Sequence, residues 1–247
     1  KRDMFNKNFS IITAVGAATL MTMGIANAAD LSFNAKELNG SSSYFGLAHA
    51  DSDLTPISFM EKRSNLQTGN TRHGKTVNFD DPKGFLATYG NDYGYVRLET
   101  EVGYRQTDVK SMSGKNDVAY TRVNGNVEMG TALMNLAVEY SVDPSTLSDG
   151  VPSGFSVTPY VSVGGGVLGA FGDLNYKRNS TNHTESPVEN QFFAAPAAQA
   201  GVGLTIGMPF GVEVFGGYSE LLAFTYNYKD TNDIYIKTFS GGLRVNF

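Results

Sequence analysis

The stretch GYVRLETEVGYR, residues 94–105, decides the fold. Apolar and charged side chains alternate along it, which is the pattern of a β-strand, because successive side chains of a strand point to opposite faces. One face carries Val96, Leu98, Thr100, Val102 and Tyr104. The other face carries Arg97, Glu99, Glu101 and Arg105. This segment is therefore predicted to be a strand with one apolar and one charged face.

Period-2 alternation of this kind recurs along most of the chain, separated by polar connections. Eight strands are predicted, at residues 43–50, 84–90, 93–106, 131–142, 154–171, 190–208, 212–225 and 233–247. Long polar connections at 51–83, 107–130, 172–189 and 226–232 alternate with short turns. The first of these contains no clear strand, and the second is expected partly to extend its neighbouring strands. An even strand number with alternating long and short connections is typical of a transmembrane up-and-down β-barrel with four external loops.

The first 28 residues are predicted to be a cleaved secretory signal peptide. A basic start with Lys1, Arg2 and Lys7 precedes an apolar stretch over 9–25. Ala26, Ala28 and Ala29 then mark an A-x-A cleavage site. The alternative is an uncleaved membrane anchor, which the small residues and the acid that follow disfavour. Residues 29–247 are expected to form the barrel, with no further domain.

In a narrow barrel that crosses a membrane, apolar faces meet lipid and polar faces fill the interior. A charged interior network is predicted from Arg97, Glu99, Glu101, Arg105, Glu139, Glu213 and Arg244. The three arginines are expected to pair with the four glutamates, because buried charges persist only when they are paired and hydrogen-bonded. The alternative is a soluble sheet whose charges face water. Candidates for aromatic girdles at the membrane surfaces are Tyr89, Tyr140, Tyr160, Tyr218 and Tyr235.

The sequence ends in an alternating strand with an aromatic last residue. Its apolar positions are Phe239, Leu243, Val245 and Phe247. This ending resembles the signal that the barrel-assembly machinery reads on the last strand of outer-membrane proteins, so these four residues are predicted to be an assembly signal.

Composition excludes several classes of function. The chain has no Cys, which excludes disulfides and thiolate metal sites. A net charge of −5 without a basic run disfavours nucleic-acid binding. The three histidines, His49, His73 and His183, have no ligand-spaced partners, so no metal site is expected. Gly164, Gly166 and Gly169 match a dinucleotide fingerprint by letter, but no helix follows them. No catalytic residue or cofactor is predicted.

Most of the chain after residue 42 resembles the opacity-protein and surface-antigen family of outer-membrane barrels, relatives of the membrane half of OmpA. The matching segments, in family order, are residues 43–48, 94–105, 133–142, 158–167, 214–219 and 241–247. One departure concerns the seventh strand, where the family has Gly-Tyr-Arg and this chain has Gly217, Tyr218 and Ser219. One interior arginine is therefore expected to be missing, which leaves Glu213 or Glu220 to other partners.

The resemblance implies an outer-membrane surface antigen or adhesin without enzymatic activity, whose external loops contact a host surface, a serum protein or an environmental ligand. The barrel itself would contact bilayer lipid and lipopolysaccharide or other outer-leaflet lipid. A small porin or an envelope-stabilising barrel is the alternative. An outer-membrane lipid hydrolase that uses His49 is a remote one, because nothing in the sequence places a nucleophile and an orienting group beside it.

Overall fold

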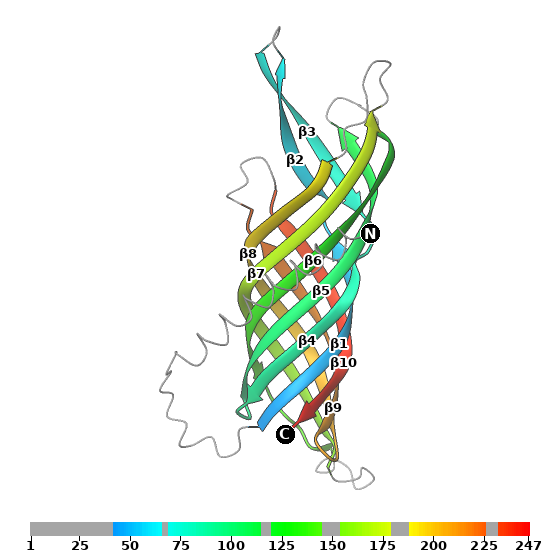
Figure 1. The fold of residues 1–247 in the computed structure, drawn as a ribbon. Coiled ribbons are helices and arrows are strands. Elements are labelled where there is room, and N and C mark those ends of the chain that lie inside the picture. Colours follow the sequence, from blue (N-terminus) through cyan, green and yellow to red (C-terminus); the bar gives the residue numbers. More distant parts are fainter. Residues whose placement is uncertain (1–41, 66–68, 115–119, 145–153, 179–187, 226–231) are drawn as a thin grey trace.

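The protein is all-β in the computed structural model, which describes residues 42–65, 69–114, 120–144, 154–178, 188–225 and 232–247. Figure 1 shows strands that tilt steeply around a common axis. The strands are β1 Ser42–Leu54, β2 Ile57–Asn65, β3 Gly69–Phe79, β4 Lys83–Asp92, β5 Val96–Gly114, β6 Tyr120–Glu139, β7 Ser156–Arg178, β8 Val188–Met208, β9 Val212–Ala223 and β10 Ile234–Asn246. No helix in this described part is both long and apolar enough to cross a membrane.

Eight of these strands form a closed ring. Each of β4 to β9 pairs antiparallel with the next strand along the chain, and β1 pairs with both β4 and β10. The β1–β10 ladder runs from Tyr44 opposite Asn246 to Leu54 opposite Ile236. The ring has no free edge, so the backbone groups of the wall bond within the wall. The predicted eight-stranded antiparallel barrel is confirmed.

All eight predicted strands are present, but the polar stretch 51–83 was predicted wrongly. It contains β2 and β3, which pair with each other as a hairpin. The base of β3 continues onto β5, from Lys75 opposite Gly114 to Phe79 opposite Val109. Figure 1 shows this hairpin projecting beyond one end of the barrel. It was missed because most residues in this stretch of the sequence are polar, so the alternation on which the prediction relied is weak there.

The stretch 107–130 does extend its neighbours, as expected, because β5 runs to Gly114 and β6 starts at Tyr120. The long connections all leave the same end of the barrel, where the β2–β3 hairpin also lies. The turns 93–95 and 209–211 lie at the other end, as does the connection between β6 and β7, and Gly94 takes a left-handed φ of 93° in the first of these turns. Its backbone N–H donates to the Asp92 carboxylate at 2.6 Å.

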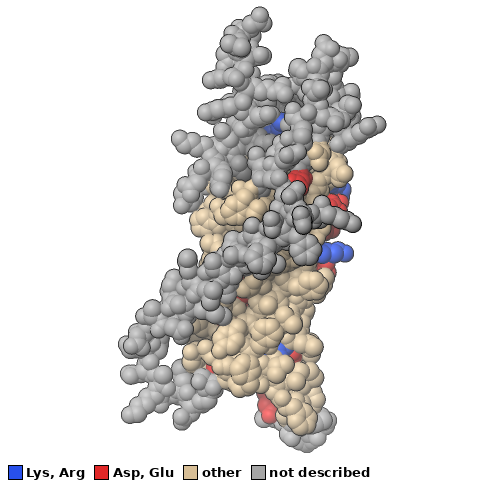
Figure 2. Space-filling model, in the orientation of Figure 1, with Lys and Arg blue, Asp and Glu red and all other residues tan. Residues whose placement is uncertain are grey.

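The outer wall of the barrel is apolar. Large hydrophobic side chains point outward from all eight strands of the ring, among them Phe45, Leu47, Phe85, Val96, Leu136, Val163, Val202, Leu204, Val214 and Leu243. Phe85 is 67% exposed and Val163 61%. In Figure 2 most of the described wall is free of charged side chains, which gather in small patches near the edge and the lower end of the view. A face of this kind is stable only against lipid.

Inward-facing glycines make room for large interior side chains. The Tyr160 ring on β7 passes over Gly203 on β8, where an added Cβ would meet the ring carbon Cζ and the hydroxyl oxygen. It also reaches Gly217 on β9, whose Cβ would lie 2.7 Å from the Tyr160 hydroxyl oxygen. These two glycines therefore fix the place of Tyr160 across the barrel.

We predict that Gly203→Ala lowers the free energy of unfolding by about 1–3 kcal/mol, because the new methyl group collides with the Tyr160 ring. Gly216→Ala on β9 is the matched control, since its Cβ would find its nearest atom, the Ser240 carbonyl oxygen, at 3.6 Å. Urea unfolding followed by circular dichroism measures both variants. Equal losses in the two variants would contradict this packing account.

Candidate functional site

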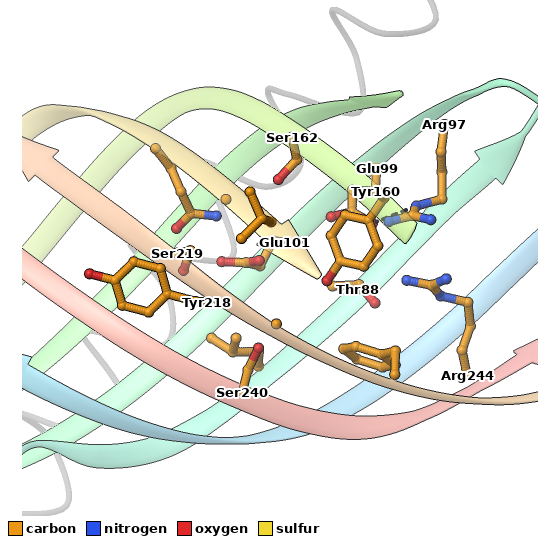
Figure 3. Close-up of a pocket in the computed structure, with 16 residues that line it drawn as sticks. Thr88, Arg97, Glu99, Glu101, Tyr160, Ser162, Tyr218, Ser219, Ser240 and Arg244 are labelled. Carbon is orange, nitrogen blue, oxygen red and sulfur yellow. Dashed lines mark hydrogen bonds and ion pairs between the residues drawn. The ribbon is translucent and has the colours of Figure 1, made fainter. Parts of the chain in front are cut away.

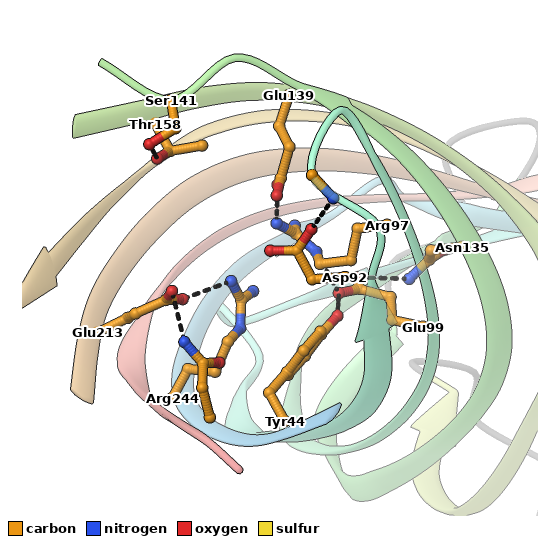
Figure 4. Close-up of polar contacts among 12 residues, drawn as sticks. Tyr44, Asp92, Arg97, Glu99, Asn135, Glu139, Ser141, Thr158, Glu213 and Arg244 are labelled. Carbon is orange, nitrogen blue, oxygen red and sulfur yellow. Dashed lines mark hydrogen bonds and ion pairs between the residues drawn. The ribbon is translucent and has the colours of Figure 1, made fainter. Parts of the chain in front are cut away.

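The interior of the barrel holds a polar cluster around Arg97, near the end with the short turns. Arg97 Nε lies 3.3 Å from a Glu99 carboxylate oxygen, and a second nitrogen of the guanidinium bonds Glu139 on β6. The Tyr44 hydroxyl of β1 donates to Glu99 at 2.6 Å. Figure 4 shows these side chains converging from three strands. Arg97 is 2% exposed, so its charge is compensated almost entirely by these partners.

A second ion pair lies across the barrel from the first. Arg244 on β10 donates to Glu213 on β9 at 3.1 Å, and the Asn246 amide donates to the other oxygen of Glu213 at 2.8 Å. The Arg244 guanidinium lies 4.3 Å from the centre of the Tyr44 ring and 4.9 Å from that of Phe215. The Tyr44 ring thus connects the two arginine clusters, and its face adds a cation–π contact.

Arg105 differs from the expectation that it pairs with a glutamate. Its guanidinium donates to the hydroxyl oxygens of Ser52 at 3.2 Å, Thr131 at 3.4 Å and Thr238 at 3.4 Å. It is 1% exposed. The hydroxyls come from β1, β6 and β10, and sequence alternation cannot show that they meet one arginine. The structure brings the other network residues close to one another but leaves Glu101 without an arginine within ion-pair distance.

The interior near the long connections is apolar, which the sequence analysis did not predict. A buried cluster there consists of Leu54, Met129, Leu133, Leu168, Ala195, Ala197, Leu221, Ala223, Ile234 and Ile236. Large side chains of this cluster meet across the bore and fill it. Strand alternation could have predicted this cluster, because residues two positions apart in a strand share a face. Leu133 is two positions from Asn135 and Leu221 two positions from Ser219, so each leucine points inward with its polar neighbour.

Between the ion pairs and the apolar cluster lies a cavity of about 40 Å³. Figure 3 shows its lining side chains, with Glu101 projecting among them. The polar lining comprises Thr88, Arg97, Glu99, Glu101, Tyr160, Ser162, Gln199, Ser219, Ser240 and Arg244. Ser219 stands where the family resemblance leads one to expect an arginine, so the missing side chain coincides with this space. Glu213 is bound by Arg244, and Glu220 accepts from Tyr218 on the outer wall at 2.5 Å.

One girdle candidate was assigned to the wrong face. Tyr160 points into the bore, where the Arg97 guanidinium lies 4.8 Å from the centre of its ring. Its neighbours on β7, Pro159 and Val161, point outward. Because adjacent residues of a strand point to opposite faces, alternation from Val161 would have placed Tyr160 inside. Tyr89, Tyr140 and Tyr235 face outward and are exposed.

The four residues of the predicted assembly signal all lie on the outer wall of β10 or directly after it. Phe239, Leu243, Val245 and Phe247 are each about half exposed or more. Their outward position would let the barrel-assembly machinery contact them, but it does not test the predicted signal. The predicted cleavage residues Ala26, Ala28 and Ala29 lie outside the described residues.

His49 lies on the outer wall rather than in a site. Its imidazole is 3.4 Å from the Asp51 carboxylate and meets the Phe85 ring edge-on, with ring centroids 5.8 Å apart. Neither of these contacts of His49 is a hydroxyl nucleophile. Across the described ranges, no group of three His, Cys, Asp or Glu side chains is arranged to hold a metal ion.

We predict that Arg97→Ala lowers the free energy of unfolding by about 3–5 kcal/mol, because Glu99 and Glu139 lose their buried counter-charge. Lys110→Ala is the control, since its exposed pair with Asp80, at 3.6 Å, contributes below about 1 kcal/mol. The chain has no Trp, so circular dichroism rather than tryptophan fluorescence follows unfolding. A loss in Arg97→Ala as small as that of the control would show that the cluster does not stabilise the barrel.

No protein-family model and no curated protein matches the chain. Solved outer-membrane proteins align with it at low identity. Ail, the attachment invasion locus protein of Yersinia pestis, is 10% identical with a TM-score of 0.40, over 84% of this chain and 99% of Ail. Neisserial surface protein A is 13% identical with a TM-score of 0.42, over 85% of this chain and 100% of that protein. OprG from Pseudomonas aeruginosa is 15% identical with a TM-score of 0.36, over 84% of this chain and 96% of OprG.

At such identities and TM-scores the functions of these proteins do not transfer, and the fold rests on the strand pairing itself. The wall is apolar outside, its interior carries paired charges, and its backbone has no free edge in the ring. This arrangement is the reverse of a soluble sheet and matches the requirements of a bilayer. The chain is an eight-stranded outer-membrane β-barrel.

Proposed function

We propose that the protein is a surface antigen or adhesin, whose external connections contact a host surface, a serum protein or an environmental ligand. The observation that carries the proposal is the projecting β2–β3 hairpin together with the extended ends of β5 and β6. These strands place paired backbone well beyond the wall (Figure 1). Strands that extend beyond the apolar wall do not anchor the barrel in the bilayer, but they can contact a partner outside the cell.

The interior supports a role at the loops rather than transport through the bore. The apolar cluster of Leu133, Leu168, Leu221 and their neighbours fills the barrel below the long connections. The two arginine clusters fill it near the opposite end. An envelope-stabilising role remains the second candidate, because a filled barrel is rigid. A lipid hydrolase would require activity that is lost in His49→Ala, and we propose no catalytic role.

We further propose that the outer wall contacts bilayer lipid and lipopolysaccharide or another outer-leaflet lipid. Phe239, Leu243, Val245 and Phe247 would be read by the barrel-assembly machinery before insertion. The outward, exposed position of all four supports this role. Replacement of Phe247 by Ser is expected to reduce the folded fraction in cells without changing the stability of barrel that has folded.

The adhesin proposal is tested by replacing residues 57–79 with a short Gly-Asn turn and measuring binding of intact cells to host cells. Binding is expected to fall strongly while heat-modifiable gel migration stays normal, because β1 and β4 pair independently of the hairpin. Phe210→Gly, in the turn at the opposite end, is the control and should leave binding unchanged. If neither this replacement nor deletion of the other external loops in turn changes binding, the proposal is wrong.

The filled interior predicts no steady conductance when the purified barrel is inserted into planar bilayers. The bore would have to lose the packing of Leu133 against Leu168 and Leu221 to admit ions. A large and stable conductance of the unaltered protein would favour the porin alternative over the surface-antigen proposal.

A further inference from the structure

The β2–β3 hairpin is a basic segment of an acidic protein. Residues 57–79 hold four of the 19 basic residues of the chain and one of its 24 acidic residues. The hairpin is therefore positive by three charges, whereas the rest of the chain, with 15 basic and 23 acidic residues, is negative by eight. Lys75 is buried at the base of the hairpin. The charged residues that lie further out are Glu61, Lys62, Arg63 and Arg72 (Figure 1).

The strand register places two of these cations opposite each other. Lys62 of β2 pairs with Arg72 of β3, and residues that are directly opposite in an antiparallel pair belong to one face. The positions of that face two residues away along each strand are Met60, Ser64, Asn70 and Gly74. None of these four residues is acidic. Because like charges directly opposite destabilise a strand pair, an acidic partner at this face would stabilise the hairpin.

The outer edge of β2 is open beyond its base. Among the described strands, β2 is the last in the sheet order and pairs only with β3. At the base, the Ser58 N–H donates to the Asn232 side-chain oxygen at 2.6 Å, and the Asn232 N–H donates to the Ser58 carbonyl oxygen at 3.2 Å. Both backbone groups of Ser58 thus face away from β3. Since alternate residues direct their backbone groups to the same edge, those of Met60, Lys62 and Ser64 also face outward.

The open edge and the unbalanced charge coincide at Lys62. We propose that the outer edge of β2 binds an extended acidic segment of a partner protein outside the cell, which adds to the hairpin as one further strand. This inference rests on the proposed surface function and names the chemistry of its partner. Backbone hydrogen bonds to Met60, Lys62 and Ser64 hold the segment. An Asp or Glu opposite Lys62 continues the row that begins with Arg72.

Other occupants match only part of this surface. A second copy of the hairpin would bring the positive charges of two edges together, and cations on an edge strand disfavour such pairing. A polyanionic glycan would meet the cations but would leave the backbone groups of the edge without partners. An acidic polypeptide uses both the charges and the backbone groups.

The test measures the binding of labelled peptides to the full chain in zwitterionic detergent micelles by fluorescence anisotropy. A short peptide of alternating Thr and Glu is expected to bind, whereas its analogue of alternating Thr and Lys is not. Lys62→Glu should weaken binding of the Glu peptide about tenfold, because it turns an attraction into a repulsion. Lys237→Glu, which reverses an exposed charge on β10, is the matched control and should leave binding unchanged.

Two further variants separate strand addition from attraction between charges. Met60→Pro keeps every charge and removes one outward N–H that does not bond β3, a change that edge strands tolerate. It should abolish binding of the Glu peptide, whereas Met60→Ala should not. The double variant Lys62→Glu with Arg72→Glu should bind the Lys peptide in place of the Glu peptide, which would also show that its hairpin still forms.

Several results would overturn the inference. Binding that persists in Met60→Pro and is displaced by dextran sulfate would indicate a polyanion recognised by charge alone. Equal binding of the two peptides, or binding of neither, would contradict an acidic strand. Self-association of the protein that Met60→Pro removes would indicate a second copy.

The cell-binding assay reports separately on the proposed surface function. If replacement of residues 57–79 abolishes cell binding while the Glu peptide does not bind, the hairpin is the adhesive element but its partner is not an acidic strand. If the Glu peptide binds as expected while the replacement leaves cell binding unchanged, the edge site stands and the adhesive role of the hairpin is wrong.

Discussion

The antiparallel ladder between β1 and β10 is the contact on which the rest of the structure depends. It joins strands about 190 residues apart in the chain and closes the sheet, from Tyr44 opposite Asn246 to Leu54 opposite Ile236. In a bilayer no water is present to satisfy a free strand edge, and each unsatisfied backbone group costs several kcal/mol. Closure removes this cost, and it also creates an inside and an outside, so that each side chain of the wall must suit one or the other.

The interior of the barrel has two zones, one filled by paired charges and one filled by apolar side chains. Arg97 and Arg244 bind carboxylates at one end, where tyrosine rings also pack against both guanidinium groups. Leucine, isoleucine and methionine fill the other end. Arg105 is held among hydroxyls beside the apolar zone, and Glu101 faces the cavity between the zones. The glycines beneath Tyr160 allow the bulky ring to cross a narrow barrel.

This division assigns different tasks to different parts of the molecule. The wall and its filling hold the protein in the membrane, while the β2–β3 hairpin and the long ends of β5 and β6 extend beyond it. The cavity beside Glu101 belongs to the barrel itself and lies apart from these extensions. Substitutions in the extensions and in the interior can therefore be studied separately.

The sequence by itself determined the barrel, because alternation along residues such as Val96 to Arg105 reports which side chains share a face, and because the number of such strands is even. It also predicted a charged network in the interior. Only the tertiary structure decided which of them meet: Arg97 takes Glu139 from the neighbouring strand, Arg105 takes hydroxyls from three strands, and Glu101 takes no arginine. It likewise revealed the β2–β3 hairpin and the inward Tyr160. The reason is physical, since alternation fixes direction within one strand, whereas contacts across a bore depend on the register between strands that are distant in the sequence.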